Sequence, residues 1–581
     1  MNYENGMKVS SFLKSQPRAK PIGIGDFAKA LERPWRYSLS SIGSSTRTLG
    51  LAISGGVDSM ALAVLCSRLQ SAPVPFSEEV ETAGNFKSHV FRHLPIIDFK
   101  AFVVDHGVRI GSGEEAKWVA AILNSKGIST RVLKIDWHDL TDPVSRPNFE
   151  TLARTRRWQL LGKACKSRDI RSLLLAHHQD DQVETILMRM SKGQKNSGLA
   201  GIKAEGGIPE CYGIHGLHES GHFDLPQTSK SDEPGDLEPS EPPQILSESG
   251  GIRVYRPLLD FDKDRLIATC QAHGMKWFED PTNKDPSLTT RNTIRHIYKT
   301  HKLPVALSKP FLLKLSERCR QNVAARHELA ESLLSKCEVS NFDKRFGTLQ
   351  VRFPRLENIS SREAAEVIRR IMILVTPEEH VPTPSLSTMI QRIFPDSQNQ
   401  APRQPKSFTV AGVLFQPLLA DSEHEEYSPY DKSTPPKWLL SRQLHYNSKL
   451  KPAITFPPRN PRSPAWSNWQ LWDGRYWFRV QNNHPLPVTV RTFGQGDMRS
   501  FSNDKSTSGL KSQFRRFAPG KIRYTLPCLV IPKETISKGL GDTVVALPTL
   551  DISNKYLQDH VKWEVRYKKV YWDGLPDPVS T

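Results

Sequence analysis

The segment Ser54-Gly-Gly-Val-Asp-Ser59 is the part of the chain best suited to bind a phosphate. It follows the apolar run Leu49–Ile53 and precedes a segment of helical period, Met60–Gln70. The two glycines allow a tight turn and close approach to a ligand, and the start of a helix offers free amides and the positive end of its dipole. The segment therefore predicts a phosphate or pyrophosphate site. An ordinary glycine-rich turn is the alternative, and a Walker A loop is absent from the chain.

A second group of reactive side chains lies in the run His177-His-Gln-Asp-Asp-Gln-Val-Glu-Thr185. In a helix that begins near Asp180, both Asp180 and Asp181 can share one face with Glu184, because residues three and four apart are neighbours. Such carboxylates could hold and deprotonate an amine. A solvated helix start also favours acidic residues, but it leaves the two adjacent histidines unexplained.

The elements that would position these residues alternate between apolar runs and helical patterns. Strands are predicted at 49–53, 100–105, 128–136 and 172–176, and helices at 60–70, from 112, at 148–165 and at 180–190. Ser112 and Glu115 have the spacing of a reciprocal helix cap. The alternation predicts an α/β domain with a parallel sheet. In such a sheet the Ser54 loop, Asp105 and His177 all lie at carboxyl ends of strands, where ligands gather.

The S-G-G-V-D-S segment resembles the signature of the PP-loop ATP pyrophosphatases, which cleave ATP to AMP and pyrophosphate. Further segments resemble the motifs of one group within that superfamily, the tRNA(Ile)-lysidine synthetases, and they occur in the same order. They are Val104–Arg109, Asn148–Arg154, His177–Thr185, Ser197–Gly201, Arg256–Leu259, Glu279–Asn283 and Arg291–Arg295. Together they span about residues 48–300, and a set in this order is far more specific than a single motif. The stretch 284–290 departs from the family pattern, which usually has a Tyr there.

The resemblance implies ATP-dependent ligation of free L-lysine to C2 of the wobble cytidine in a tRNA(Ile) with a CAU anticodon. The product, lysidine, would form through an adenylated cytidine. ATP and Mg²⁺ are the implied cofactors, with Asp58 as the candidate Mg²⁺ ligand. The implied catalytic residues are Asp58, His177, Asp181 and Glu184. The implied ATP-binding residues are Ser54, Gly55, Gly56, Val57, Asp58 and Ser59. The implied substrate or tRNA contacts are Asp105, His106, Arg109, Arg154, Arg157, Arg291 and Arg295.

Three other functions share parts of this pattern. A PP-loop tRNA thiolase shares the adenylation step, but such enzymes generally resemble one another in carrying paired cysteines, and this chain has no C-x-x-C. A catalytically silent tRNA-binding homologue would keep the fold and lose ATP cleavage. A small-molecule synthetase of the superfamily would not need the basic C-terminal half.

Composition and patterning divide the chain into five regions. Residues 1–47 form a basic extension, either a transit peptide or a plain basic tail. Residues 48–300 form the PP-loop domain, which carries a flexible acidic insertion at 203–250. A helical tRNA-contacting region at 301–394 precedes a Pro-rich linker at 395–465. The last region, 466–581, is predicted to be a small β-containing domain, and it faintly resembles the family's C-terminal tRNA-binding domain.

The overall composition fits a protein with a polyanionic partner. The 80 Lys and Arg exceed the 61 Asp and Glu by 19, which favours nucleic acid without establishing it. No stretch approaches the ~18 apolar residues of a membrane span, so no membrane association is expected. The seven scattered cysteines predict neither disulfides nor a metal knuckle and fit a reducing compartment. We expect a mitochondrion or another organelle, with the cytoplasm as the alternative.

Overall fold

The protein divides into two compact units in the computed structural model. The first comprises Met1–Tyr212, Gly216–His218 and Gly251–Ala324, and the second comprises Gly213–His215, Glu219–Gly250 and Ala325–Thr581. The structure describes residues 19–39, 47–71, 75–82, 86–93, 97–109, 111–139, 142–223, 244–279, 290–355, 360–394, 405–418, 435–445, 451–460, 462, 465–498, 514–515, 518, 520–532, 542–554, 557 and 559–571.

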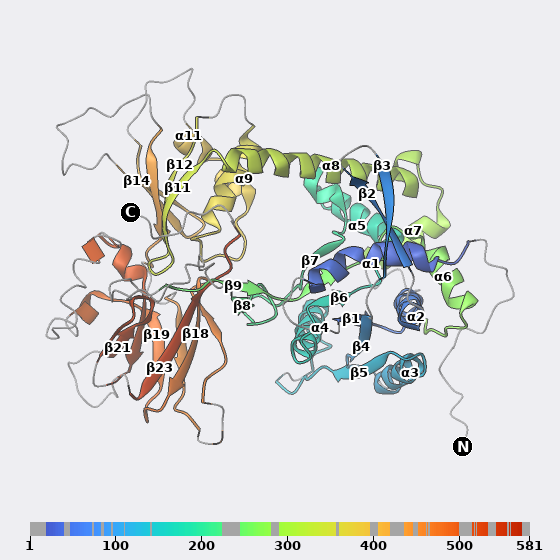
Figure 1. The fold of residues 1–581 in the computed structure, drawn as a ribbon, viewed down its shortest axis with the longest axis horizontal. Helices are drawn as coiled ribbons and strands as arrows, with labels where there is room; N and C mark the ends of the chain where they lie inside the picture. The colour runs from blue at the N-terminus through green and yellow to red at the C-terminus, as the bar shows by residue number, and fades with distance from the viewer. Residues whose placement is uncertain are drawn as a thin grey trace. The chain divides into compact units, whose positions relative to one another are not determined.

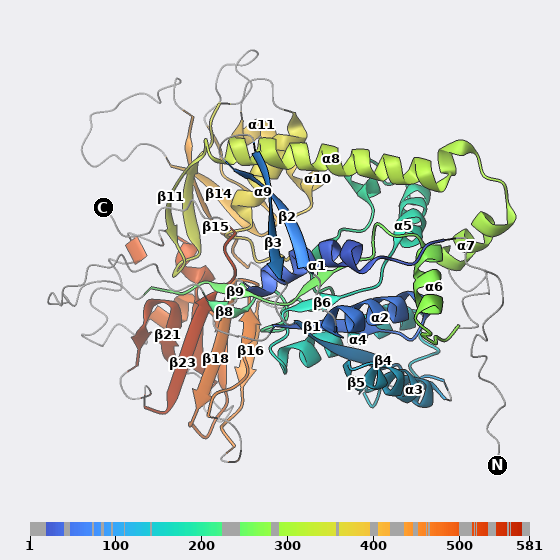
Figure 2. The same ribbon diagram turned by 45° about the vertical axis from the view of Figure 1, so that its right-hand side comes forward.

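A six-stranded sheet in the order β5-β4-β1-β6-β10-β7 forms the centre of the first unit (Figures 1 and 2). Its strands are β1 (Arg47–Ile53), β4 (Ile97–Asp105), β5 (Ser129–Lys134), β6 (Ser172–Leu174), β7 (Glu205–Gly207) and β10 (Arg253–Tyr255). All neighbours from β5 to β10 pair in parallel, and only the edge strand β7 runs antiparallel within this sheet. A separate hairpin joins β2 (Pro75–Thr82) to β3 (Phe86–His93). The predicted α/β class with a parallel sheet is confirmed.

Helices cover both faces of this sheet, as a parallel sheet requires. The helices of the first unit are α1 (Ile24–Leu39), α2 (Val57–Ser71), α3 (Ser112–Ser125), α4 (Phe149–Lys166), α5 (Gln179–Ser191), α6 (Lys263–Ala272), α7 (Thr290–Thr300) and the 3₁₀ turns η1 (Asn196–Ala200) and η3 (Val305–Leu307). Alternate residues of β1 and β4 pack with α1, α2, α3 and α6 in one apolar core. Helix α4 lies against β4 and contributes no residue to that core, which places it on the opposite face. Each predicted strand and helix of residues 48–191 overlaps an observed one.

The predicted helix cap at Ser112 is wrong. Gly111 occupies the N-cap position of α3 with a left-handed backbone, and no side chain caps the helix there. The Ser112 hydroxyl instead donates to Asp105 Oδ1 at 2.6 Å. Glu115 pairs with Arg109. The spacing was right for a cap, but Asp105, seven residues away, is the stronger acceptor because it is a carboxylate.

Helix α1 corrects the expected boundary of the N-terminal extension. Residues 1–18 lie outside the described residues, but Ile22, Phe27, Ala28 and Leu31 are buried in the same core as β1 and α2. Phe27 and Leu31 have no exposed surface. A removable leader that ended at residue 47 would strip these side chains from the core. The region 1–47 is therefore no single detachable extension.

The segment 203–250 is also more structured than an acidic insertion should be. Residues 224–243 lie outside the described residues. On either side of them, β8 (Gly221–Phe223) pairs with β9 (Glu248–Gly250), and the carboxylate of Glu248 is fully buried against His215 and Arg566. Glu248 lies at the end of the acidic stretch, and its charge forms buried ion pairs in the folded protein.

The second unit contains two five-stranded sheets and one three-stranded sheet (Figure 1). The first has the order β11-β12-β15-β14-β13, with β11 (Glu338–Asp343), β12 (Thr348–Arg352), β13 (Phe408–Val410), β14 (Val413–Leu418) and β15 (Lys437–Arg442). The second has the order β16-β19-β20-β21-β22, with β16 (Ala453–Phe456), β19 (Val488–Thr492), β20 (Pro527–Ile531), β21 (Thr543–Leu547) and β22 (Ile552–Ser553). The third has the order β17-β18-β23, with β17 (Gln470–Trp472), β18 (Tyr476–Asn482) and β23 (Val561–Tyr567).

Few helices accompany these sheets among the described residues. They are α9 (Ser361–Met372), α10 (Thr383–Leu386), α11 (Ile390–Ile393), the 3₁₀ turns η5 (Gln495–Asp497), η7 (Ile522–Thr525) and η8 (Pro548–Leu550), and the C-terminal part of α8 (Lys309–Leu334). The predicted C-terminal strands are confirmed.

Two predicted regions differ from this arrangement. The region 301–394 contains strands β11 and β12 as well as helices, and the expected linker 395–465 contains β13, β14, β15 and β16. Phe415 and Trp438 in this stretch are fully buried and lie edge to face. These strands are only three to six residues long, so each is too short to show the periodicity that would predict it.

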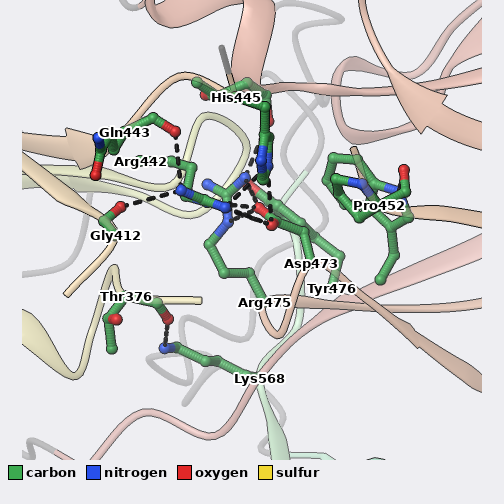
Figure 3. A network of polar contacts seen from close by, with 12 residues as sticks. Thr376, Gly412, Arg442, Gln443, His445, Pro452, Asp473, Arg475, Tyr476 and Lys568 are labelled. Atoms are coloured by element: carbon green, nitrogen blue, oxygen red, sulfur yellow. Dashed lines mark hydrogen bonds and ion pairs between the residues drawn. The ribbon is translucent and has the colours of Figure 1, made fainter. Parts of the chain in front are cut away.

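A buried ionic network lies inside the second unit. Figure 3 shows Asp473 between two arginines and a histidine. Its carboxylate accepts from Arg442 Nη2 at 3.0 Å and Arg475 Nη2 at 2.8 Å, and it lies 3.3 Å from His445 Nε2. Burial raises the pKa of Asp473, but Arg475, His445 and Arg442 together hold it well below its usual value. The network joins β15 to the β17–β18 turn.

Candidate active site

The Ser54–Ser59 loop connects β1 to α2 and is shaped by Ser59. The Ser59 hydroxyl oxygen accepts from the amide of Gly55 at 3.1 Å and that of Ser54 at 3.3 Å, and the hydroxyl donates to the Gly56 carbonyl at 2.9 Å. Gly55 has φ +86°, and a Cβ there would lie 2.8 Å from Val119 Cγ2. Only glycine fits this position. The loop therefore ends a strand and opens a helix, the arrangement that binds phosphates.

Asp58 connects this loop to the acidic helix α5. It is the second residue of α2 and lies in the first turn of that helix. Its Oδ1 lies 3.4 Å from His178 Nε2, and its Oδ2 lies 3.5 Å from Lys263 Nζ. Burial raises the pKa of Asp58, but His178 and Lys263 lower it by more. The pKa of Asp58 therefore lies below its usual value. Asp58 is therefore an anion at neutral pH.

His178 is a site residue that sequence reasoning did not assign. It caps α5: Nδ1 accepts from the Asp180 amide at 3.2 Å, and Asp181 Oδ2 accepts from the His178 amide at 3.0 Å. In the neutral ring the proton is therefore on Nε2, which faces Asp58 and also lies 3.6 Å from Asp181 Oδ2. Burial lowers the pKa of His178, but Asp58 and Asp181 outweigh it and raise the pKa. The spacing from His178 to Asp181 matches a capping box and was the available signal.

Glu184 is held by two arginines from α7. Its carboxylate lies 2.9 Å from Arg291 Nε and 2.6 Å from Arg295 Nε. Burial lowers the pKa of Arg295, but the bond and charge of Glu184 raise it overall. The structure thus brings together the predicted catalytic Glu184 with Arg291 and Arg295. Phosphate binding by these two arginines stays a prediction.

His177 lies beside Asp181 and contacts Arg256. Arg256 Nε donates to His177 Nδ1 at 3.1 Å. Burial lowers the pKa of His177 to about 4, with Asp181 opposing the shift and the charges of Arg256 and Arg291 adding to it. Sequence reasoning placed Arg256 in a motif but gave it no role in the site.

The remaining predicted residues make further contacts near β4, α3 and α4, and the charge of Arg154 also acts on Arg256. Asp105 Oδ1 accepts from the Gly107 amide at 2.9 Å as well as from Ser112, which fixes the turn after β4. Burial and the charge of Arg157 lower the pKa of His106. Arg154 pairs with Glu210 at 3.1 Å. Their roles toward substrate or tRNA stay predictions, as does the family-divergent stretch 284–290, most of which lies outside the described residues.

Asp58 fits an Mg²⁺ site only in part. Within the described part of the chain, no group of three or more His, Cys, Asp or Glu side chains is placed to hold a metal ion. Mg²⁺ at nucleotide sites usually takes one or two carboxylates, with phosphates and water as its other ligands. Asp58 can supply such a carboxylate, because its Oδ1 is buried without a well-formed hydrogen bond.

The cysteines stand apart from this chemistry. All seven are free and buried. Burial raises the pKa of Cys270 to about 12 and that of Cys66 well above its usual value. A thiolate is therefore disfavoured at these positions. None of the helices in the described part of the chain is both long enough and apolar enough to cross a membrane.

Comparisons with known proteins relate the chain to one domain family and to several named proteins. The PP-loop domain family matches residues 28–300. The probable tRNA(Ile)-lysidine synthase of Schizosaccharomyces pombe is 28% identical over 513 residues, which cover 87% of this chain and 91% of that protein. The tRNA(Ile)-lysidine synthase of Methylobacterium nodulans is 29% identical over 316 residues, or 54% of this chain and 70% of that protein.

Among solved structures, the U34-tRNA thiolase of Methanococcus maripaludis is 13% identical. The match covers 50% of this chain and 79% of that one with a TM-score of 0.30. Residues 28–300 thus match the PP-loop domain family, and the similarity of the chain to a protein named probable tRNA(Ile)-lysidine synthase extends over most of its length.

Proposed function

We propose that this protein is an ATP-using tRNA-modifying enzyme that ligates lysine to C2 of the wobble cytidine in a tRNA(Ile) with a CAU anticodon. The observation that carries the proposal is the contact of Asp58 with His178. It joins the phosphate-type loop to the acidic helix α5, so a nucleotide site and an amine-handling site share one location. The names of the relatives support tRNA(Ile) as the substrate.

The reaction needs two displacements. The C2 oxygen of cytidine attacks the α-phosphorus of ATP, and pyrophosphate leaves. The ε-amine of lysine, after losing a proton, then attacks C2, and AMP leaves with the former C2 oxygen. Adenylation is needed because the carbonyl oxygen is a poor leaving group and AMP is a good one.

The chain's own residues would divide this work between loop and helix. The Ser54–Ser59 loop would bind the phosphates of ATP. Mg²⁺, held in part by Asp58, would supply charge neutralisation when bound. Asp181 and Glu184 offer carboxylates to a lysine ammonium group, and we assign them to lysine binding.

Thiolation is the less favoured alternative. Thiolate chemistry needs an accessible, ionised sulfur, whereas every cysteine here is buried. A catalytically silent tRNA-binding homologue differs in one measurable respect, because it would bind tRNA without cleaving ATP.

The test is incorporation of labelled lysine into a CAU-anticodon tRNA(Ile) transcript in the presence of ATP and Mg²⁺. We expect incorporation by the wild type and none by Asp181→Ala. Asp264→Ala is the matched control, because it removes the same charge from an exposed aspartate on α6, outside the site. A transcript with uridine at the wobble position should accept no lysine. ATP cleavage without lysine incorporation would contradict the proposal.

We also propose that tRNA contacts extend into residues 301–394 and 466–581 and that the protein acts in an organelle. The basic excess of the chain and the basic residues among 1–18 support these two points. Imaging of the tagged full-length protein tests the location, and a purely cytoplasmic signal would contradict it.

A further inference from the structure

We propose that Arg256 is a positioning residue that fixes the proton of His177 on Nε2. His177 then donates a hydrogen bond to an oxygen of the reacting groups and does not take the proton from lysine. This inference rests on the proposed function, and it names the chemical role of one residue in that site.

The donor inventory of arginine determines the tautomer. A guanidinium group has five N–H donors and no acceptor. Because Arg256 Nε lies 3.1 Å from His177 Nδ1, that nitrogen must be the acceptor. A neutral imidazole whose Nδ1 accepts carries its single proton on Nε2. Protonation of Nδ1 would direct an N–H group at a cation.

The backbone holds Arg256 in place. Arg256 directly follows β10, which pairs in parallel with β6, and Leu175 after β6 donates its amide to Tyr255 at 2.8 Å. The Arg256 guanidinium also donates from Nη1 to the Lys203 carbonyl at 2.9 Å, and its amide donates to Ala204 at 2.9 Å. The two strand ends therefore set the spacing between Arg256 and His177.

The charges around His177 support the same protonation state. Burial is the largest influence and lowers its pKa, as do Arg256, Arg291 and His178, while Asp181 opposes them. The resulting pKa of about 4 keeps the ring neutral at physiological pH. Burial lowers the pKa of Arg256 only to about 10, so the guanidinium stays charged. His177 is thus a fixed neutral donor beside a fixed cation.

A fixed neutral donor suits one task in the proposed reaction. Oxygens of the phosphate and of the departing AMP gain negative charge, and a preorganised N–H stabilises such oxygens. His177 neither gains nor loses a proton in this role. The proton of the lysine ammonium group passes instead to one of the carboxylates assigned to lysine binding, Asp181 or Glu184.

Two substitutions of His177 separate the donor role from a base role. Gln places an amide N–H near the position of Nε2 and cannot titrate, whereas the shorter Asn cannot reach it. We expect His177→Gln to keep kcat/KM for lysine incorporation within about 10-fold and His177→Asn to lose about 100-fold or more, as expected for loss of one oxyanion donor. Equal loss in both variants would overturn the proposal.

Substitutions of Arg256 test the positioning. Arg256→Met should lower kcat and give kcat/KM a new dependence on pH near the ordinary histidine pKa of about 6.5. Arg256→Lys, which keeps a charged donor, should restore the wild-type profile. Arg253→Met is the matched control, because Arg253 lies on β10, three residues before Arg256, and forms an ion pair with Glu205. A pH profile of Arg256→Met that matches the wild-type profile would overturn the proposal.

Nitrogen NMR of the full-length protein with ¹⁵N-labelled histidine needs no substrate. The signal assigned to His177, by its loss in His177→Gln, should show an unprotonated Nδ1 and a protonated Nε2 from pH 6 to 8. A proton on Nδ1 would refute the tautomer. If the wild type ligates no lysine, the proposed function fails, and this spectrum still decides whether Arg256 fixes the ring.

Discussion

At the scale of single residues, Ser59 determines the shape of the phosphate loop. Its side-chain oxygen accepts from two loop amides and donates to one loop carbonyl. We expect Ser59→Ala to lower kcat/KM for ATP about 5-fold, since one lost hydrogen bond is worth about 1 kcal/mol and 1.4 kcal/mol is tenfold. Steady-state kinetics with tRNA-stimulated ATP cleavage would measure this.

Ser67→Ala is the control for that experiment. Ser67 lies eight residues after Ser59 on the same helix α2, and its hydroxyl donates to the Lys126 carbonyl at 2.6 Å. Its removal costs a similar hydrogen bond far from the loop. Equal falls in ATP kinetics for both variants would show that the effect of Ser59 is one of stability alone.

The residue contacts also explain which residues of the site could be predicted from the sequence. The motifs predicted Asp58, His177, Asp181 and Glu184 as a group, and the structure places them near one another. His178 and Arg256 were not assigned, because their partners are distant in sequence. Asp58 precedes His178 by 120 positions, and Arg256 follows His177 by 79. No local pattern reports these distant pairings, and the capping-box spacing of His178 and Asp181 marks only the start of α5.

At the scale of elements, the turn between β1 and α2 depends on the backbone of Gly55. A side chain there meets both an unfavourable φ of +86° and a contact of 2.8 Å with Val119 on α3. We expect Gly55→Ala to destabilise the protein by about 1–3 kcal/mol. Gly56→Ala is the matched control, because its Cβ would meet only Ser54 Oγ at 3.9 Å. Urea unfolding compares the two, and equal stability would contradict the account.

Helix α1 carries a second prediction at this scale. Deletion of residues 1–18 keeps Ile22 and the rest of the described core and serves as the reference. Deletion of residues 1–46 also removes Phe27 and Leu31, whose full burial is worth about 1.5–3 kcal/mol each. We expect that protein to unfold at a clearly lower urea concentration or to aggregate. A stable deletion of 1–46 would support the detachable extension instead.

The elements differ in how well the sequence predicts them. In the PP-loop domain, buried parallel strands and long helices alternate, and Leu49–Ile53 and Asp180–Met190 are recognisable from their periods. In the second unit, β13 has three residues and β16 has four, and prolines flank β16. Such strands are specified by pairing with distant partners, as in β12 with β15, and not by their own pattern.

At the scale of the whole molecule, we expect the buried ion pairs of Asp473 to stabilise the second unit (Figure 3). Asp473 and Arg475 have side chains that are 4% and 0% exposed. Asp473→Asn would leave Arg442 and Arg475 without their shared anion. Removing one partner of a buried ion pair costs about 3–5 kcal/mol, and the urea midpoint should fall accordingly.

Glu564→Gln provides the comparison in the same unit. Its ion pair with Arg479 is partly exposed, with side chains 37% and 30% accessible, and such pairs are worth about 0–1 kcal/mol. Equal stability of the two variants would contradict the role of the network.

The stability of the second unit should also depend on pH through Asp473. Because folding lowers the pKa of Asp473, its contribution to the free energy of unfolding is fully present above its unfolded pKa of about 3.9. That contribution is lost as pH falls through the folded value.

The central claim is that the shared site of the PP loop and α5 attaches lysine to cytidine. The most direct measurement is mass spectrometry of the wobble nucleoside after reaction of CAU-anticodon tRNA(Ile) with ATP, Mg²⁺ and isotope-labelled lysine. The account predicts a cytidine that carries the labelled lysine, formed only with ATP and absent with Asp181→Ala. A nucleoside with sulfur at C2, or an unmodified cytidine after ATP has been cleaved, would contradict it.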